Sequence, residues 1–78
     1  MIAHLSGIVL DKQQQTLILD VHGVGYLVHT LRSIIEKTEV GDQIELHIHT
    51  IVREDLIALY GFATQEQHEL FKLVLSVS

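Results

Sequence analysis

The chain has 78 residues, no cysteine, no proline and a formal net charge of −5 at pH 7. Its length allows one small domain, and its lack of cysteine excludes disulfides and thiolate metal sites. The acidity argues against a basic groove for nucleic acid, because phosphate contacts need clustered cations, and the five lysines and arginines are scattered. Without a secretory leader pattern or an 18-residue apolar run, we expect a soluble, cytoplasmic protein with no membrane partner.

Alternation of polar and apolar residues, the pattern of half-buried strands, predicts five strands. They span residues 2–10, 16–21, 24–31, 43–52 and 56–62. A polar turn at residues 11–15 separates the first two strands, and His22-Gly23 reverses the chain after the second. We expect Gly7 to mark a bulge or a close backbone approach, and Gly25 to make room for coiling of the sheet.

The remaining segments are a connector and a helix. Residues 33–40 are ambiguous and could form one helical turn before Gly41-Asp42. A helix is predicted to begin at Thr64, whose hydroxyl can cap the first turn while Gln67 reaches back as a capping box. An apolar stripe at three-to-four spacing follows, made of Leu70, Phe71, Val74 and Leu75.

Five short strands followed by a helix predict an all-β fold. We expect a five-stranded OB-fold barrel over residues 1–63 and a short C-terminal α-helix over residues 64–78. Strand count alone does not separate an OB-fold from an SH3-like barrel. The apolar fraction of 47% is high for so short a chain, which indicates that some apolar surface contacts other chains or domains.

The most informative segment is the reversal between the last two strands, where Glu54 and Asp55 are adjacent. We predict that they form the tip of a two-residue hairpin. Such loops usually need positive φ, which asparagine and glycine adopt readily and glutamate adopts poorly. The tip then breaks a local rule, as functional sites often do. Alone, the pair is more simply interpreted as a solvated charged turn.

Patterns for catalysis or metal binding are weak. His47 and His49 share one face of a strand, but zinc sites need three or four convergent ligands, so a polar strand face explains them and no metal site is predicted. Glu54 and Asp55 would diverge rather than flank a bond, and the phosphate-loop motif GxxxxGK[ST] is absent. We predict a non-enzymatic domain with no catalytic residue and no cofactor.

An OB-fold that binds single strands needs stacked aromatic residues and basic residues in a groove. Only four aromatic residues are present, Tyr26, Tyr60, Phe62 and Phe71. Tyr60 and Phe62 share a strand face and are interpreted as core. A stand-alone OB module that binds single-stranded nucleic acid or a protein partner stays open as the alternative, and a purely structural, self-associating barrel is a third.

Five short motifs occur in an order that resembles one family. They are MIAHLSG at 1–7, GVGY at 23–26, VRED at 52–55, LYGF at 59–62 and LFK at 70–72. Each is weak alone, but the ordered set closely resembles the N-terminal domain of the RuvA family, the Holliday-junction-binding subunits of a bacterial branch-migration machine. Ala3 and His4 depart from the usual pattern and lie outside the VRED segment.

The resemblance implies a role for the acidic tip. Glu54 and Asp55 match the family's acidic pin, which four-fold symmetry would place around the centre of a four-way junction. Arg53 would contact a phosphate or a neighbouring subunit. Separately, the apolar run Leu56, Ile57, Ala58 and Leu59 is a candidate subunit interface; barrel closure could equally cover it on both faces, and the first strand is another candidate.

The resemblance also implies partners outside this chain. Duplex DNA would be held mainly by a helix-hairpin-helix domain that follows residues 64–78 and is missing here. ATP-dependent helicase activity would belong to the RuvB ATPase, recruited through a missing C-terminal domain. The expected full-length protein is a homotetramer that acts in homologous recombination, DNA repair and the SOS response.

Overall fold

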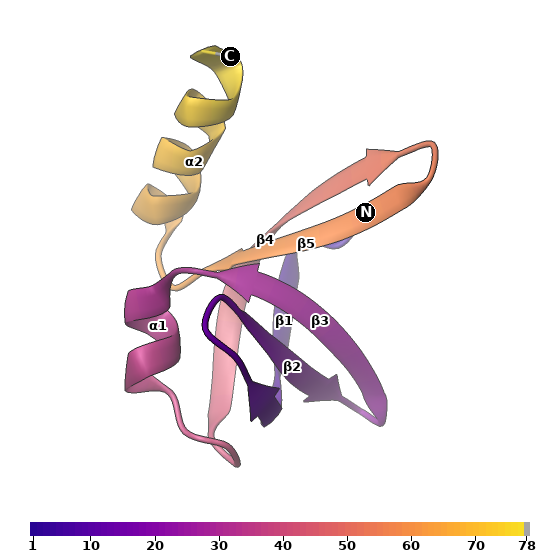
Figure 1. Cartoon of the computed structure of the whole chain (residues 1–78), viewed down its shortest axis with the longest axis vertical. Helices are drawn as coiled ribbons and strands as arrows, with labels where there is room; N and C mark the ends of the chain where they lie inside the picture. Colours follow the sequence, from indigo (N-terminus) through magenta and orange to yellow (C-terminus); the bar gives the residue numbers. More distant parts are fainter. Residues whose placement is uncertain (78) are drawn as a thin grey trace.

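The computed structural model describes residues 1–77 as one barrel with two helices beside it (Figure 1). Its elements are, in order, β1 (His4–Lys12), β2 (Thr16–Val21), β3 (Val24–Thr30), α1 (Arg32–Lys37), β4 (Gln43–Arg53), β5 (Leu56–Phe62) and α2 (Gln65–Val77). The predicted strands are all present with small shifts at their ends. The ambiguous segment 33–40 contains a short helix, α1.

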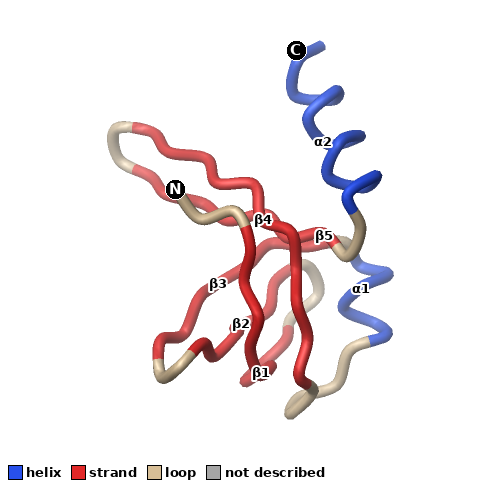
Figure 2. Tube along the Cα trace, turned by 180° about the vertical axis from the view of Figure 1, so that it is seen from behind, coloured by secondary structure: helices blue, strands red, loops and turns tan. Residues whose placement is uncertain are grey.

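The five strands form a closed barrel in the order β1-β2-β3-β5-β4. Every neighbouring pair is antiparallel except β3 and β5, which are parallel over Val28–Thr30 and Leu59–Gly61. This architecture confirms the predicted OB-fold barrel followed by a helix. In the rear view, the long β4–β5 hairpin leaves the barrel on the side opposite α1 and α2 (Figure 2).

The core fills the barrel with aliphatic side chains from all five strands. Its buried members are Leu5, Val9, Leu17, Leu19, Val28, Ile35, Leu46, Ile48 and Leu59. Ile35 comes from α1, so this short helix covers an opening of the barrel. Lys12 anchors it by donating hydrogen bonds from Nζ to the carbonyl oxygens of Ile35 and Thr38, at 3.2 and 2.5 Å.

Two glycines allow close approach between strands. A Cβ at Gly7 would overlap the carbonyl oxygen of Asp20, which confirms the predicted close approach; the bulge of β1 lies farther along, between Val9 and Asp11. A Cβ at Gly61 would lie 2.7 Å from Cγ1 of Val28 and point into the core. The close approach at Gly61 was not predicted.

α2 begins as predicted and rests lightly on the barrel. The Thr64 hydroxyl accepts a hydrogen bond from the Gln67 N–H at 3.1 Å, and Gln67 Oε1 accepts one from the Thr64 N–H at 3.3 Å, which completes the capping box. Of the predicted apolar stripe, only Phe71 is half-buried. The other members, Leu70, Val74 and Leu75, are exposed. None of the helices among residues 1–77 has the length and apolar character needed to cross a membrane.

Candidate functional site

The β4–β5 hairpin is longer than the barrel that holds its base. β4 and β5 pair from His47 and Phe62 outward to Arg53 and Leu56. β1 pairs with β4 only as far as His47, and β3 pairs with β5 only from Leu59 onward. Residues 51–58 therefore project beyond the neighbouring strands as a two-stranded arm, called the hairpin arm below (Figures 1 and 2).

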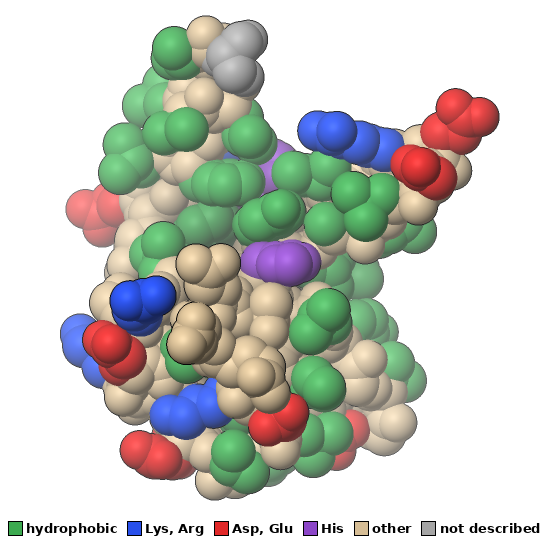
Figure 3. Space-filling model, in the orientation of Figure 1, with side chains coloured by type: hydrophobic (Ala, Val, Ile, Leu, Met, Phe, Trp, Pro, Cys, Tyr) green, Lys and Arg blue, Asp and Glu red, His purple; other side chains and the backbone are tan. Residues whose placement is uncertain are grey.

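Glu54 and Asp55 are the two turn residues at the end of the hairpin arm, between the paired residues Arg53 and Leu56. Both acidic residues and Arg53 are exposed, and within residues 1–77 none of the three has a side-chain hydrogen bond or an ion pair. Acidic side chains mark the far end of the arm, with a basic side chain beside them (Figure 3). The tip thus presents two free carboxylates and one free guanidinium to solvent.

The prediction that the turn at Glu54 and Asp55 has positive φ was wrong. Among the described residues, His22 is the only non-glycine with positive φ, at 51°, so Glu54 and Asp55 both have ordinary negative φ. The turn that does use positive φ is His22-Gly23, where Gly23 has φ 91°, as a type I′ hairpin turn requires. Backbone strain therefore says nothing about why the tip is acidic.

The electrostatic effect of the tip is local. Two like charges 4 Å apart repel by about 1 kcal/mol in water and about 4 kcal/mol at an effective dielectric of 20. Physiological salt screens such interactions over about 8 Å. Arg53 partly offsets the negative charge of Glu54 and Asp55 at the tip. The arrangement can repel a phosphate brought against the tip, but it has no effect on DNA held elsewhere.

The candidate interface in β5 divides into two parts. Leu56 and Ile57 lie on the hairpin arm with exposed fractions of 49% and 71%, whereas Ala58 and Leu59 are buried. The expectation that both faces of this whole run could be covered was therefore wrong for the outer half, because β1 and β3 end before reaching it. Val52, the cross-strand partner of Ile57, is also exposed and was missed. Val52 and Ile57 form an exposed apolar pair on one face of the arm, and Leu56 is exposed on the other face, beside the acidic tip.

A second group of side chains, the α2 cluster, gathers where α2 meets the barrel. It consists of His49, Tyr60, Phe62, His68 and Phe71. Phe71 stacks on Tyr60 with ring centres 5.2 Å apart and tilts against Phe62 at 5.0 Å. His49 is a structural histidine, because α2 packs against it through His68 and Phe71. Within the described residues, no three potential ligands converge on a metal position.

Sequence reasoning missed His68 because its role depends on tertiary packing. Its ring stacks on Phe62 at 5.6 Å, and its Nε2 lies 3.1 Å from Nδ1 of His49. The available signal was its position three residues before Phe71, which puts both on the same helix face. Burial lowers the pKa of His68 from the usual value, with a further lowering by the positive charge of Lys72.

Comparison with known proteins gives a consistent result. The sequence profile of the RuvA N terminal domain matches residues 1–61. Proteins named Holliday junction branch migration complex subunit RuvA are 49% identical in Legionella pneumophila (strain Corby) and in Citrifermentans bemidjiense, and 46% identical in Halothermothrix orenii. Each alignment covers 100% of this chain and 40% of the relative. The chain belongs to the RuvA N-terminal domain family.

Proposed function

We propose that this chain is the oligomer-forming, acidic-pin domain of a Holliday-junction-binding subunit that acts in branch migration during recombination and DNA repair. The observation that carries the proposal is the pair Glu54 and Asp55, exposed and unpaired within the described residues, at the end of an arm that projects from a rigid barrel. Family membership supports it, because the relatives are named as subunits of the branch migration complex.

The mechanism follows from symmetry and charge. A four-way junction has four arms, so a four-fold homotetramer can offer each arm the same surface. Four acidic tips near the axis would bring eight carboxylates of Glu54 and Asp55 to the crossover point. Repulsion of phosphates within a Debye length would guide strands apart at the centre and slow their re-pairing. The acidic tips would oppose binding slightly while directing the strands.

Subunit contacts and DNA contacts would divide between neighbouring residues. The exposed pair Val52 and Ile57 on one face of the arm, and Leu56 on the other, are the apolar residues available to another subunit. The buried residues Ala58 and Leu59 would support them from the inner part of β5. Arg53, unpaired within residues 1–77, would contact either a phosphate or a carboxylate of the next subunit.

The firm grip on DNA would lie outside this chain. A net charge of −5 leaves little attraction for phosphate, and the chain spans 40% of the length of the relatives. We assign duplex binding to a helix-hairpin-helix domain after α2, and ATP-driven helicase activity to a RuvB partner. This domain would then be a non-catalytic part of a cytoplasmic complex and would need no cofactor.

A chimera can test this proposal with a complete subunit. Residues 1–78 would replace the matching part of the Legionella pneumophila relative, with Glu54→Gln and Asp55→Asn introduced together. We expect junction affinity to stay equal or rise by up to about fivefold, as loss of about 1 kcal/mol of repulsion allows. The rate of RuvB-driven branch migration should change. Glu36→Gln with Glu39→Gln, the same charge change beside α1, is the control, and an unchanged migration rate in the tip variant would refute the pin.

One cleft favours a second candidate function, binding of single strands by the barrel alone. It measures about 400 Å³ and its lining includes the stacked rings of His29, Tyr60 and Phe71 together with Arg32. Aromatic rings beside a cation are what unpaired bases and phosphates contact. A titration of the 78-residue chain with a single strand, a duplex and a four-way junction at fixed salt separates the two. The acidic-pin function predicts negligible binding to all three, and tight single-strand binding favours the second candidate.

A further inference from the structure

α2 is attached to the barrel by few contacts. No residue of α2 is fully buried, and its half-buried residues include His68 and Phe71. Phe71 packs on Tyr60 and Phe62, and the His68 ring lies nearly parallel to Phe62, with an angle of 9° between the ring planes. An attachment this small is sensitive to the loss of any one contact.

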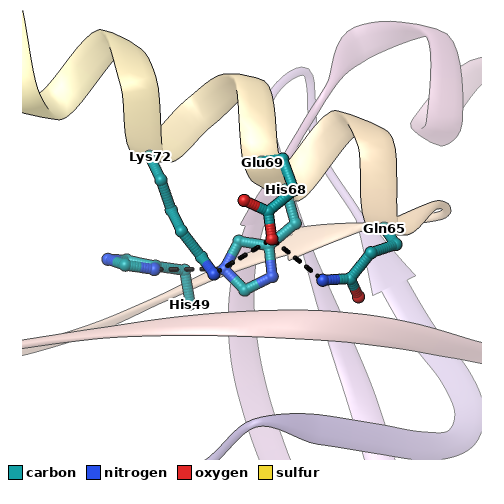
Figure 4. A network of polar contacts seen from close by, with 5 residues as sticks. All are labelled: His49, Gln65, His68, Glu69 and Lys72. Carbon is teal, nitrogen blue, oxygen red and sulfur yellow. Dashed lines mark hydrogen bonds and ion pairs between the residues drawn. The ribbon is translucent and has the colours of Figure 1, made fainter.

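A histidine pair supplies a polar contact at this junction. Nδ1 of His49 on β4 lies 3.1 Å from Nε2 of His68 on α2, with the rings nearly perpendicular at 76° (Figure 4). For this to be a hydrogen bond, one of the two nitrogens must carry a proton and the other must not. The contact therefore depends on the protonation state of both rings.

The number of protons on the two rings decides whether the hydrogen bond between His49 and His68 can form. In the neutral pair, one ring donates to the other. A first added proton is tolerated, because it can sit on an outward nitrogen and leave one N–H between His49 and His68. A second added proton puts an N–H on each of the two facing nitrogens, which removes the hydrogen bond and sets two cations against each other.

The surroundings oppose a positive charge on His68. Burial is the largest cause of its lowered pKa, followed by the charges of Lys72 and His49, with a smaller contribution from His47 on β4. From β5, the neighbouring ring is that of Phe62, which contributes no compensating negative charge.

One group acts in the opposite direction. Glu69 on α2 raises the pKa of His68, but its carboxylate already accepts hydrogen bonds from Lys72 Nζ at 3.3 Å and from Gln65 Nε2 at 3.1 Å (Figure 4). These bonds lower the pKa of Glu69 itself. Its negative charge is thus shared with Lys72 and compensates only part of a charge on His68.

We propose that His49 and His68 form a proton-operated latch, which fastens α2 to the barrel near neutral pH and releases it in mildly acidic solution. An undocked His68 would accept a proton near its ordinary pKa of about 6.5, whereas the docked one accepts it only at lower pH. Docking is therefore strongest above about pH 6.5 and weakens as the pH falls below it. Below the lowered pKa it changes no further. Release would allow α2 to take other orientations relative to the barrel.

The latch can be tested on the 78-residue chain by NMR. We expect the ring of His68 to gain its second proton at a pH below the ordinary value of about 6.5. Between pH 7.5 and 5.5, hydrogen exchange of α2 amides, corrected for its intrinsic pH dependence, should accelerate about fivefold if docking lowers the pKa of His68 by one unit, and at most about tenfold for a larger shift. Exchange in the barrel strands should not. An ordinary pKa for His68, together with α2 protection that does not change with pH, would overturn the latch.

A variant separates the latch from simple packing. His68→Phe keeps a ring against Phe62 and removes the titrating group, so its α2 protection should not change between pH 7.5 and 5.5. His22→Asn is the control, because His22 is exposed on a turn with positive φ that asparagine accepts; it should keep the wild-type pH dependence. Wild-type pH dependence in His68→Phe would contradict the proposal. If α2 does not dock in His68→Phe at any pH, the NMR experiment on the unmodified chain becomes the deciding test of the latch.

Discussion

The two halves of the β4–β5 hairpin share one hydrogen-bonded ladder but differ in burial and in the elements that cover them. The base, residues 43–50 and 59–62, turns one face into the barrel, and α2 covers the other face only around His49, Tyr60 and Phe62. Leu59 and Phe62 are buried there. The hairpin arm exposes Val52 and Ile57 and ends in unpaired charges. One continuous pair of strands is thus held in the barrel at its base and carries the exposed acidic tip at its other end.

Alternation along the strands explains how both halves arise from one pattern. Ile48 and Leu59 point into the barrel, whereas His49 and Tyr60, one residue on, point toward α2. Along the hairpin arm, the same two faces of the hairpin continue beyond the point where the barrel and α2 cover them. Val52 and Ile57 are therefore the outward extension of the core stripe, left for another molecule to cover.

The largest expected difference between base and arm comes from truncating the same residue type in each. Ile48→Ala removes a side chain that is 2% exposed and should lower the free energy of unfolding by about 3 kcal/mol. Ile57→Ala, on the arm with 71% exposure, should change it by less than about 0.5 kcal/mol. Urea unfolding of both variants measures this, and equal losses would mean that the arm is part of the folded core.

A smaller effect is expected from adding one methyl group at the base. Gly61→Ala places a Cβ 2.7 Å from Val28 Cγ1 and 2.9 Å from Leu46 Cδ1, so overpacking should cost about 2 kcal/mol of unfolding free energy. Gly25→Ala is the matched change in a strand, where the nearest atom, Ile18 Cγ2, is 3.4 Å away. It should cost under about 0.5 kcal/mol in the same denaturation experiment. If Gly61→Ala costs as little unfolding free energy as Gly25→Ala, the base tolerates the extra volume and this prediction is wrong.

The smallest effect concerns the charges beside the base. Lys72→Gln removes a positive charge that lowers the pKa of His68 and frees Glu69 to raise it. The pKa of His68 should therefore rise toward its ordinary value, and the loss of α2 docking on acidification should become shallower. Ring-nitrogen NMR follows this shift, with Lys37→Gln on α1 as the distant control. A downward shift would contradict the assigned surroundings of the histidine pair.

Local signals made most of the barrel predictable. Leu17 and Leu19 follow strict alternation and are buried, His22-Gly23 has the composition of a type I′ turn, and Thr64 with Gln67 forms the predicted cap. Each of these depends on residues close together in sequence, where propensity and periodicity act directly.

The missed features all depend on where distant segments end or meet. Gly61 matters because Val28 approaches it from another strand. His68 matters because α2 folds back over β4, and Val52 is exposed because β1 stops short of the outer end of β4. The backbone of Glu54 and Asp55 was mispredicted because a two-residue loop length does not by itself fix the turn type. The sequence predicted the position of the acidic tip, but its freedom from partners required the structure.

The most direct test of the acidic tip is the salt dependence of junction binding when its charge is reversed. The chimera with Glu54→Lys and Asp55→Lys would be titrated with a four-way junction at several salt concentrations. A tip at the junction centre predicts tighter binding at low salt and a steeper loss of affinity with salt, because new phosphate contacts release more counterions. An affinity and a salt slope equal to those of the unmodified chimera would show that the tip does not approach DNA.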